Sequence, residues 1–434
     1  MIQPPSKFAS FRFGKTIAVL LATLVFLTIT PGSARESSAT NTPGKLLQSI
    51  PMTGTRVPSM DVVDRELCQF MKTWKVPGAS IAIVKNGKLV YSRGYGYANF
   101  LKREQVQPNS RFRIGSISKI LTSVAVLKMI EEGKLKLTSS AIKLLNYPLE
   151  LNPDRRADSR LQQIKIAHLL DGTAGWDRAN NGDPMFVPIV LNAAQEFSNS
   201  LRPTPEAIIR YEFTRPLDFS PGTRYCYSNL GYSMLGEIIS KVSGKKYAQY
   251  IQDELLTPLG ITSMSPGKTR VLQKDEVSYY GFPGESNGPS VFPNIRGNLP
   301  LEYGGDFYLE AMTADCGWIS STPDVAKLVA SIFGKMPVKS PLSPETRRMM
   351  ISRPKIADWE GAKEYFSMGW EVVEQKGGGI IIKKDGSLPG TSAVVVYHPT
   401  DGSTCAISFN SRPLNAIQFK DETLSLANKI LNGK

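Results

Sequence analysis

The sequence predicts an α+β fold, with one antiparallel sheet built from both chain ends and flanked by helices, and a mostly helical insertion between those ends. The first observation is a hairpin signal, in which apolar and polar residues alternate on both sides of Asn86-Gly87. The second is that such alternation returns only near the end of the chain, after helical and loop-like patterns at 134–265. Strands at both ends are most economically joined in one sheet that carries the intervening helices.

The N-terminus has the pattern of an export signal. Three basic residues precede an apolar run at 16–29, and small residues at 32–34 follow it. The run is shorter than the roughly 20 residues that a membrane span requires. We therefore expect residues 1–34 to be a signal peptide cleaved after Ala34, leaving an exported protein, periplasmic or secreted, without a stable membrane span.

The rest of the chain is expected to form a leader and a single domain. Residues 35–60 are rich in Ser, Thr, Pro and Gly, which is typical of a flexible leader. The domain is expected over 61–434, with an α/β part at about 61–115 and 314–434 and a helical part at about 116–313.

Periodicity assigns the elements of this domain in order. Its expected helices are 61–73, a helix that begins at Ser116, 231–255 and 421–431. Its expected strands are the two around Asn86-Gly87, then 369–375, 380–384, 393–397 and 404–410. Residues 266–313 are rich in Gly, Pro and aromatic residues and are expected to be irregular.

Charge and cysteine content narrow the class of protein. The formal net charge is +14, or +11 without residues 1–34, which hold three basic and no acidic residues. Because the basic residues are scattered and no zinc-finger spacing occurs, we expect no nucleic-acid partner. No C-x-x-C motif is present, so a metal or redox motif is not expected. In an oxidising compartment three disulfide pairings are open to Cys68, Cys226, Cys316 and Cys405.

A serine and a lysine stand at the start of a helix in R-I-G-S-I-S-K-I-L, residues 113–121. Ser116 and Lys119 are three residues apart and therefore share one helical face. Apolar residues then recur at helical spacing, so the pair is expected in the first turn of a helix with a buried face. One interpretation is a capping serine and a solvated lysine. The other is a nucleophile beside an amine that takes its proton.

Few groups are available to activate Ser116. The chain has only two histidines, His168 in an apolar helical run and His398 at a strand end, and it lacks a G-x-S-x-G motif. A base for Ser116 must therefore be a lysine or a tyrosine. Candidates are found in the tripeptides Y-S-N at 227–229 and K-D-G at 384–386.

Three motifs thus occur in order, S-x-x-K, Y-x-N and K-x-G, with the flanking phrases V-P-G-A-S-I-A-I-V-K-N-G, P-L-G-I-T-S-M and W-I-S-S-T-P-D-V-A. From about Pro77 to about Asn410 the sequence resembles the serine β-lactamase and penicillin-binding family. The resemblance is to the branch of class C β-lactamases, D-alanyl-D-alanine carboxypeptidases, esterases and D-aminopeptidases. It implies a β-lactamase/transpeptidase-like fold and makes 61–434 a serine hydrolase catalytic domain that needs no cofactor.

The resemblance also implies a role for each motif. Ser116 attacks a carbonyl carbon and forms an acyl-enzyme. Lys119 and Tyr227 are the alternative bases, and positive neighbours, among them Lys384, are expected to depress the pKa of both. The backbone N–H groups of Ser116 and Ser387 are expected to hold the oxyanion.

Three further residues are expected to contact the substrate. Asn229 would hydrogen-bond Lys119 or a substrate amide, and Gly386 would let the substrate lie close to its strand. Asp385 departs from the family, which usually has threonine or serine there to hold a substrate carboxylate. An aspartate repels a carboxylate, which favours an ester, an amide or a D-amino-acid compound with an amine, although Lys384 remains able to bind an anionic group.

Two classes of function follow. The first is an exported hydrolase of a small-molecule or peptide substrate, possible substrates being β-lactams, D-amino-acid peptides and carboxylic esters. The alternative is a slow-acylating or non-hydrolytic binder or sensor of cell-envelope peptides. A binder has no need of all four of Ser116, Lys119, Tyr227 and Lys384. Specificity is expected from walls formed by 172–205 and 266–313.

Overall fold

The structure is a computed structural model that describes residues 49–152 and 155–433. The expected signal peptide, 1–34, and the first part of the expected leader, 35–48, lie outside the described residues. In the described part, no helix combines the length and the apolar character that crossing a bilayer would take.

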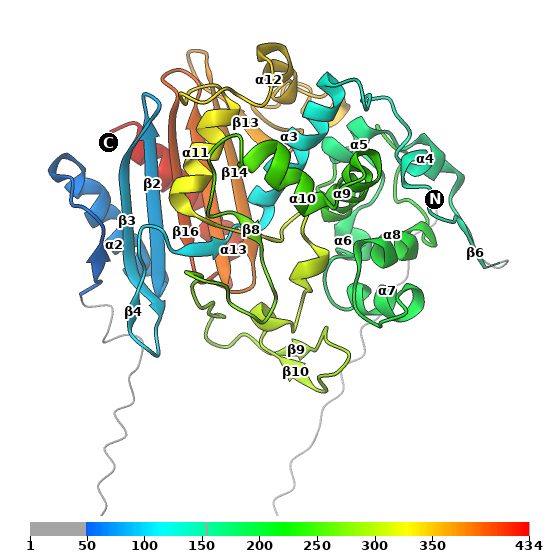
Figure 1. Ribbon diagram of the computed structural model, residues 1–434, viewed down its shortest axis with the longest axis horizontal. Coiled ribbons are helices and arrows are strands. Elements are labelled where there is room, and N and C mark those ends of the chain that lie inside the picture. Colours follow the sequence, from blue (N-terminus) through cyan, green and yellow to red (C-terminus); the bar gives the residue numbers. More distant parts are fainter. Residues whose placement is uncertain (1–48, 153–154, 434) are drawn as a thin grey trace, which may run out of the picture. The chain divides into compact units, whose positions relative to one another are not determined.

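An antiparallel sheet of nine strands dominates the described chain (Figure 1). Its order is β1-β3-β2-β16-β15-β14-β13-β12, and β4 pairs with β3. Strand β2 from the N-terminal end pairs with β16 from the C-terminal end, which confirms the expected sheet built from both ends. In chain order the strands are β1 (Met52–Thr53), β2 (Gly78–Lys85), β3 (Lys88–Asn99), β4 (Glu104–Gln105), β12 (Glu364–Ser367), β13 (Trp370–Glu374), β14 (Ile380–Leu388), β15 (Thr391–His398) and β16 (Ser403–Phe409).

Helices cover both faces of this sheet. Helices α2 (Asp61–Trp74) and α13 (Ala416–Leu431) pack on one face, and α11 (Thr322–Ile332) packs on the other. Successive residues of a strand therefore join different cores: Ile81 lies among residues of α2 and α13, whereas Ala82 lies in the larger core with α11. This division follows from the two-residue period of a strand.

The helix after Ser116 is more deeply buried than its periodicity predicts. It begins as a 3₁₀ turn, η2 (Gly115–Ile117), and continues as α3 (Ser118–Glu131). Every residue from Ser118 to Leu127 is buried, so the expectation of a single buried face is wrong. The reason is that α3 contacts α9 (Asn229–Ser243) and α10 (Tyr247–Ile251) as well as η2 and α12 (Pro344–Met350).

The expected helix 231–255 is divided in two. Helix α9 ends at Gly244, whose φ of 70° is the left-handed conformation that glycine adopts at helix ends. Helix α10 and the π turn η4 (Gln252–Leu256) follow. The other helices of this part are α4 (Ala141–Leu145), α5 (Ile166–Leu170), α6 (Arg178–Asn181), α7 (Ile189–Phe197) and α8 (Pro205–Phe213).

The remaining elements are short. A three-stranded sheet has the order β5-β11-β8, and two further pairs are β6-β7 and β9-β10. Their bounds are β5 (Arg111–Arg113), β6 (Glu150–Asn152), β7 (Arg155–Arg156), β8 (Ser265–Pro266), β9 (Gly288–Pro289), β10 (Asn298–Leu299) and β11 (Trp318–Ser321). The other 3₁₀ turns are η1 (Pro58–Met60), η3 (Ser159–Gln163), η5 (Leu301–Tyr303), η6 (Leu309–Ala311) and η7 (Ala357–Trp359).

Candidate active site

Ser116 lies in a tight turn between two sheets. The chain leaves β5, and Ile114 N donates to Trp318 O of β11 at 3.0 Å. Gly115 then adopts a φ of +50°, a conformation that favours glycine. A side chain at Gly115 would also meet the backbone N of Ser387 on β14 at 2.6 Å. Glycine here therefore lets the turn reverse against β14 and presents Ser116 at its end.

Three side chains meet at Ser116 Oγ. The Tyr227 hydroxyl donates to it at 2.6 Å and Lys119 Nζ at 3.1 Å, and Cys316 Sγ lies 3.3 Å away. Ser116 caps neither η2 nor α3, so the interpretation as a capping serine is wrong. The structure thus brings the serine, lysine and tyrosine of two separate motifs into mutual contact.

Lys119 is fully buried, which rules out a solvated lysine. Its Nζ donates to Asn229 Oδ1 at 2.6 Å and to the backbone O of Asp315 at 3.0 Å. Two of its N–H bonds therefore have fixed acceptors, and the remaining direction faces Ser116. In the ammonium form this direction carries a third N–H, and in the amine form it carries the lone pair.

Tyr227 comes from the loop before α9, where Ser228 accepts from Gly231 N and caps the helix. Burial raises the pKa of the Tyr227 hydroxyl above its usual range, and the positive charge of Lys384 opposes this rise. The expected depression of the Tyr227 pKa is therefore wrong, because desolvation outweighs the neighbouring charge. In this state Tyr227 is an uncharged hydrogen-bond donor.

Lys384 lies on β14 with a side chain that is 1% exposed. Its Nζ is 3.5 Å from Glu371 Oε1 on the neighbouring strand β13 and 5.2 Å from the ring centroid of Tyr227. Burial lowers the pKa of Lys384, but Tyr227, Glu371 and Asp385 outweigh it and the net shift is upward. Lys384 is thus a cation that already has a carboxylate partner, and sequence reasoning missed that partner.

Gly386 brings β14 against the turn that carries Ser116. A Cβ at this position would lie 1.9 Å from Ile114 O and 2.8 Å from Ser116 N. The glycine therefore allows close approach of the strand to the nucleophile turn, and its expected role in letting the substrate lie close to the strand stays a prediction. The consequence is that the backbone N–H groups of Ser116 and Ser387 lie on adjoining segments.

A cleft of about 520 Å³ opens onto Ser116. Besides residues already described, its lining includes Arg178, Phe186, Tyr225, Asp385, Arg412, Ala416, Ile417 and Lys420. Segment 172–205 contributes to the wall as expected. Among the described residues that line the cleft none comes from 266–313; the C-terminal part of the lining consists of Arg412 and the first turns of α13, with Ala416, Ile417 and Lys420.

Asp385 lines this cleft from β14. The lysines beside it in sequence have other partners: Lys383 Nζ lies 2.7 Å from Glu364 Oε1, and Lys384 pairs with Glu371. Within 49–152 and 155–433 the Asp385 carboxylate makes no hydrogen bond or close ion pair, but it acts on Lys420 of the same cleft: burial lowers the pKa of Lys420, and the charges of Asp385 and Glu371 outweigh that effect and raise it. Asp385 therefore acts on an occupant of the cleft together with Lys420.

Several residues near Ser116 carry no sequence signal. Cys316 is buried, and burial raises the pKa of its thiol to about 12. All four cysteines lie in the described residues and are free, so none of the expected pairings is formed.

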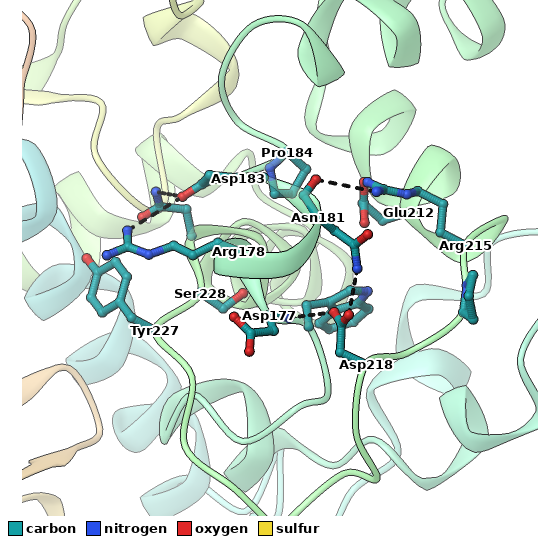
Figure 2. A pocket seen from close by; sticks show the side chains of 14 residues that line it. Asp177, Arg178, Asn181, Asp183, Pro184, Glu212, Arg215, Asp218, Tyr227 and Ser228 are labelled. Atoms are coloured by element: carbon teal, nitrogen blue, oxygen red, sulfur yellow. Dashed lines mark hydrogen bonds and ion pairs between the residues drawn. The ribbon is translucent and has the colours of Figure 1, made fainter. Parts of the chain in front are cut away.

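Asp183 accepts from Asn229 Nδ2 at 2.7 Å and borders a narrow cavity of about 20 Å³ behind Tyr227 (Figure 2). In the described chain, no group of three or more His, Cys, Asp or Glu side chains is arranged to hold a metal ion.

Comparison with known families identifies the chain. The family model described as Beta-lactamase matches residues 63–427, which is most of the chain. The protein belongs to the β-lactamase family. This agrees with the order of the S-x-x-K, Y-x-N and K-x-G motifs and with the contacts of Ser116 with Lys119 and Tyr227.

Curated relatives of this β-lactamase-family protein match it in part. Protein flp of Staphylococcus aureus (strain N315) is 30% identical over 228 residues, which cover 52% of this chain and 42% of that protein. The probable fimbrial assembly protein FimD, serogroup H1, of Dichelobacter nodosus is 32% identical over 201 residues, 46% of this chain and 45% of that protein. The match thus spans less than half the length of either relative.

Solved structures match the fold more completely. The octameric penicillin-binding protein homologue from Pyrococcus abyssi has a TM-score of 0.65 and 27% identity, covering 86% of this chain and 78% of that one. The β-lactamase/D-alanine carboxypeptidase from Pseudomonas syringae has a TM-score of 0.63 and 20% identity, covering 87% and 99%. These likenesses confirm the expected β-lactamase/transpeptidase-like fold.

Proposed function

We propose that this β-lactamase-family protein is an exported serine hydrolase that cleaves an ester or an amide through an acyl-enzyme on Ser116. The observation that carries the proposal is the contact of Ser116 Oγ with the Tyr227 hydroxyl at 2.6 Å and Lys119 Nζ at 3.1 Å. The leader pattern of residues 1–34 supports export. The three motifs in order support a place in the branch of class C β-lactamases and D-alanyl-D-alanine carboxypeptidases.

Acylation begins with attack of Ser116 Oγ on the carbonyl carbon while the serine proton moves to Lys119 in its amine form. The two fixed acceptors of Lys119 keep its lone pair aimed at Ser116. The backbone N–H groups of Ser116 and Ser387 hold the oxyanion. When the bond to the leaving group breaks, the leaving atom takes a proton from Tyr227, which recovers one from Lys119.

Hydrolysis of the acyl-enzyme reverses these roles. Water attacks the ester carbonyl and gives a proton to Lys119, and the free acid leaves as Ser116 Oγ is protonated again. The alternative assignment makes Tyr227 the base. The raised pKa of its buried hydroxyl and its role as donor to Ser116 favour Lys119 instead.

Asp385 favours a substrate without a free carboxylate. Lys384, which would attract that group, is paired with Glu371, and the Asp385 carboxylate lines the cleft. Phe186 and the 73%-exposed Ile417 add apolar surface to the lining, whereas Arg178, Arg412 and Lys420 add positive charge. Carboxylic esters and D-amino-acid amides suit Asp385 and the apolar surface, and the carboxylate of a penicillin or a D-Ala-D-Ala peptide would have to pair with one of these cations.

A hydrolysis screen tests the proposal. Nitrocefin, a p-nitrophenyl ester, a D-amino-acid amide and a D-Ala-D-Ala peptide are each incubated with the wild-type protein and with Ser116→Ala. We expect turnover of the ester or the amide, abolished in the variant. Equal rates in both proteins would refute the proposal, and an acyl adduct that forms but never leaves would indicate a binder.

A further inference from the structure

The side-chain amide of Asn229 bridges two charged residues. Its Oδ1 accepts from Lys119 Nζ at 2.6 Å, and its Nδ2 donates to Asp183 Oδ2 at 2.7 Å. A lysine ammonium can only donate and a carboxylate can only accept. Only one orientation of the amide therefore satisfies both neighbours, because a flipped amide would set oxygen against oxygen and N–H against N–H.

Asp183 is held firmly in place beside this amide. It lies between α6 and α7 with a side chain that is 14% exposed, and its Oδ1 accepts from Met185 N at 3.2 Å. Arg178 Nη1 is 3.9 Å from Asp183 Oδ2, and Figure 2 shows these two side chains facing each other. The adjoining cavity of about 20 Å³ has room for about one water molecule. On this side of the amide, solvent therefore offers about one water molecule as a substitute acceptor for Asn229 Nδ2.

We infer that Asp183 is a positioning residue that acts through Asn229 on Lys119, an inference that rests on the proposed function. By accepting from Nδ2, Asp183 keeps Oδ1 of Asn229 aimed at Lys119. Asn229 Oδ1 and the backbone O of Asp315 then accept hydrogen bonds from two N–H groups of Lys119. The third tetrahedral position of Nζ therefore points toward Ser116 Oγ.

Loss of Asp183 is expected to slow the chemical step. The amide of Asn229 is then free to flip and present its N–H₂ group to Lys119, which removes one of the two acceptors that orient Nζ. Proton transfer from Ser116 requires the two atoms within about 2.6–3.2 Å. Asp183 itself does not line the cleft around Ser116, but its ion-pair partner Arg178 does, and Arg178 lies 4.8 Å from the ring centroid of Tyr227.

The test measures the rate at which a fluorophosphonate probe labels the wild-type protein and its variants. Asp183→Ala is expected to lower the second-order rate constant by about 100-fold, the loss typical of a misplaced catalytic group. Asp183→Asn keeps an oxygen that accepts from Asn229 Nδ2, so its rate constant stays within about fivefold of wild type. Asp218→Ala is the matched control: this carboxylate borders the same cavity but accepts from Asn181 and Asp177 rather than from Asn229.

A double-mutant cycle separates positioning from a general structural role. In an Asn229→Ala background, Asp183→Ala is expected to change the labelling rate less than about twofold. The melting temperature of every variant is measured. If Asp183→Ala does not fold, it is replaced by Asp183→Leu, whose side chain cannot accept a hydrogen bond from Asn229.

Two results would overturn the inference while leaving the proposed function intact. The first is labelling of Asp183→Ala at the wild-type rate. The second is a fall in labelling rate, on adding Asp183→Ala to Asn229→Ala, that is as large as the fall it causes in the wild-type protein. Absence of label on Ser116 in the wild-type protein would instead remove the proposed function itself.

Discussion

Replacing Gly386 by alanine is expected to open the oxyanion site without removing any reacting side chain. The added Cβ would lie 1.9 Å from Ile114 O, whereas ordinary van der Waals contact begins at 3.4 Å. Either β14 or the turn at Ser116 must therefore move by a distance on the order of 1 Å. Oxyanion donors act within a window of about 0.4 Å, and loss of one costs about 10²–10³ in kcat, or about 3–4 kcal/mol of transition-state stabilisation.

The assay is single-turnover acylation by a p-nitrophenyl ester, with the melting temperature as a measure of folding. Ser387→Ala is the matched control, because it keeps the backbone N–H at the neighbouring position and removes only the hydroxyl. We expect the acylation rate of Gly386→Ala to fall by at least about 100-fold and that of Ser387→Ala to stay within about threefold of wild type. A folded Gly386→Ala protein with an acylation rate near that of wild type would refute the assignment of Ser387 N–H to the oxyanion.

Three further predictions follow from charges and contacts at the site. Asp385→Thr removes a negative charge from the cleft, so kcat/KM should rise about tenfold for a penicillin and change little for a neutral ester; equal changes in both would contradict a role in specificity. Lys119→Ala and Tyr227→Phe should each slow acylation by about 10²–10⁴, and near-normal rates in both would remove these residues from the mechanism. Burial raises the pKa of Asp315 to about 8, with the charge of Lys119 opposing, so the folded chain keeps a proton that the unfolded chain releases above about pH 4. The contribution of Asp315 to wild-type stability therefore falls as pH rises from about 4 to about 8, and Asp315→Asn, which does not titrate, should gain in melting temperature over wild type more at pH 8 than at pH 5. A gain of the same size at both pH values would argue against this titration.

The parts of the site that were predictable are those encoded in short, contiguous stretches. Ser116 and Lys119 share a helical turn whatever the rest of the chain does, so their spacing alone places them together. The hairpin of β2 and β3 follows from Asn86-Gly87 in the same local way. The end of α9 is also marked in the sequence, by Gly244. We nevertheless placed this glycine inside a longer expected helix, 231–255.

The parts that were missed depend on pairing between distant segments. Glu371 reaches Lys384 only because β13 pairs with β14, and Asp183 reaches Asn229 only because a loop folds against the start of α9. Neither contact corresponds to a motif in the sequence. The pKa of Tyr227 was misjudged for a related reason, because neighbouring charges can be counted from motifs, whereas the desolvation that outweighs them depends on burial.

The most direct test of the central claim is the intact mass of protein quenched in acid during turnover of a p-nitrophenyl ester, followed by peptide mapping of the adduct. We predict one acyl group on Ser116 in the wild-type protein, lost again as turnover completes, and no adduct on a folded Ser116→Ala protein. An acyl group that persists in Ser116→Ala, or one that maps to Cys316 at 3.3 Å from Ser116 Oγ, would contradict the account.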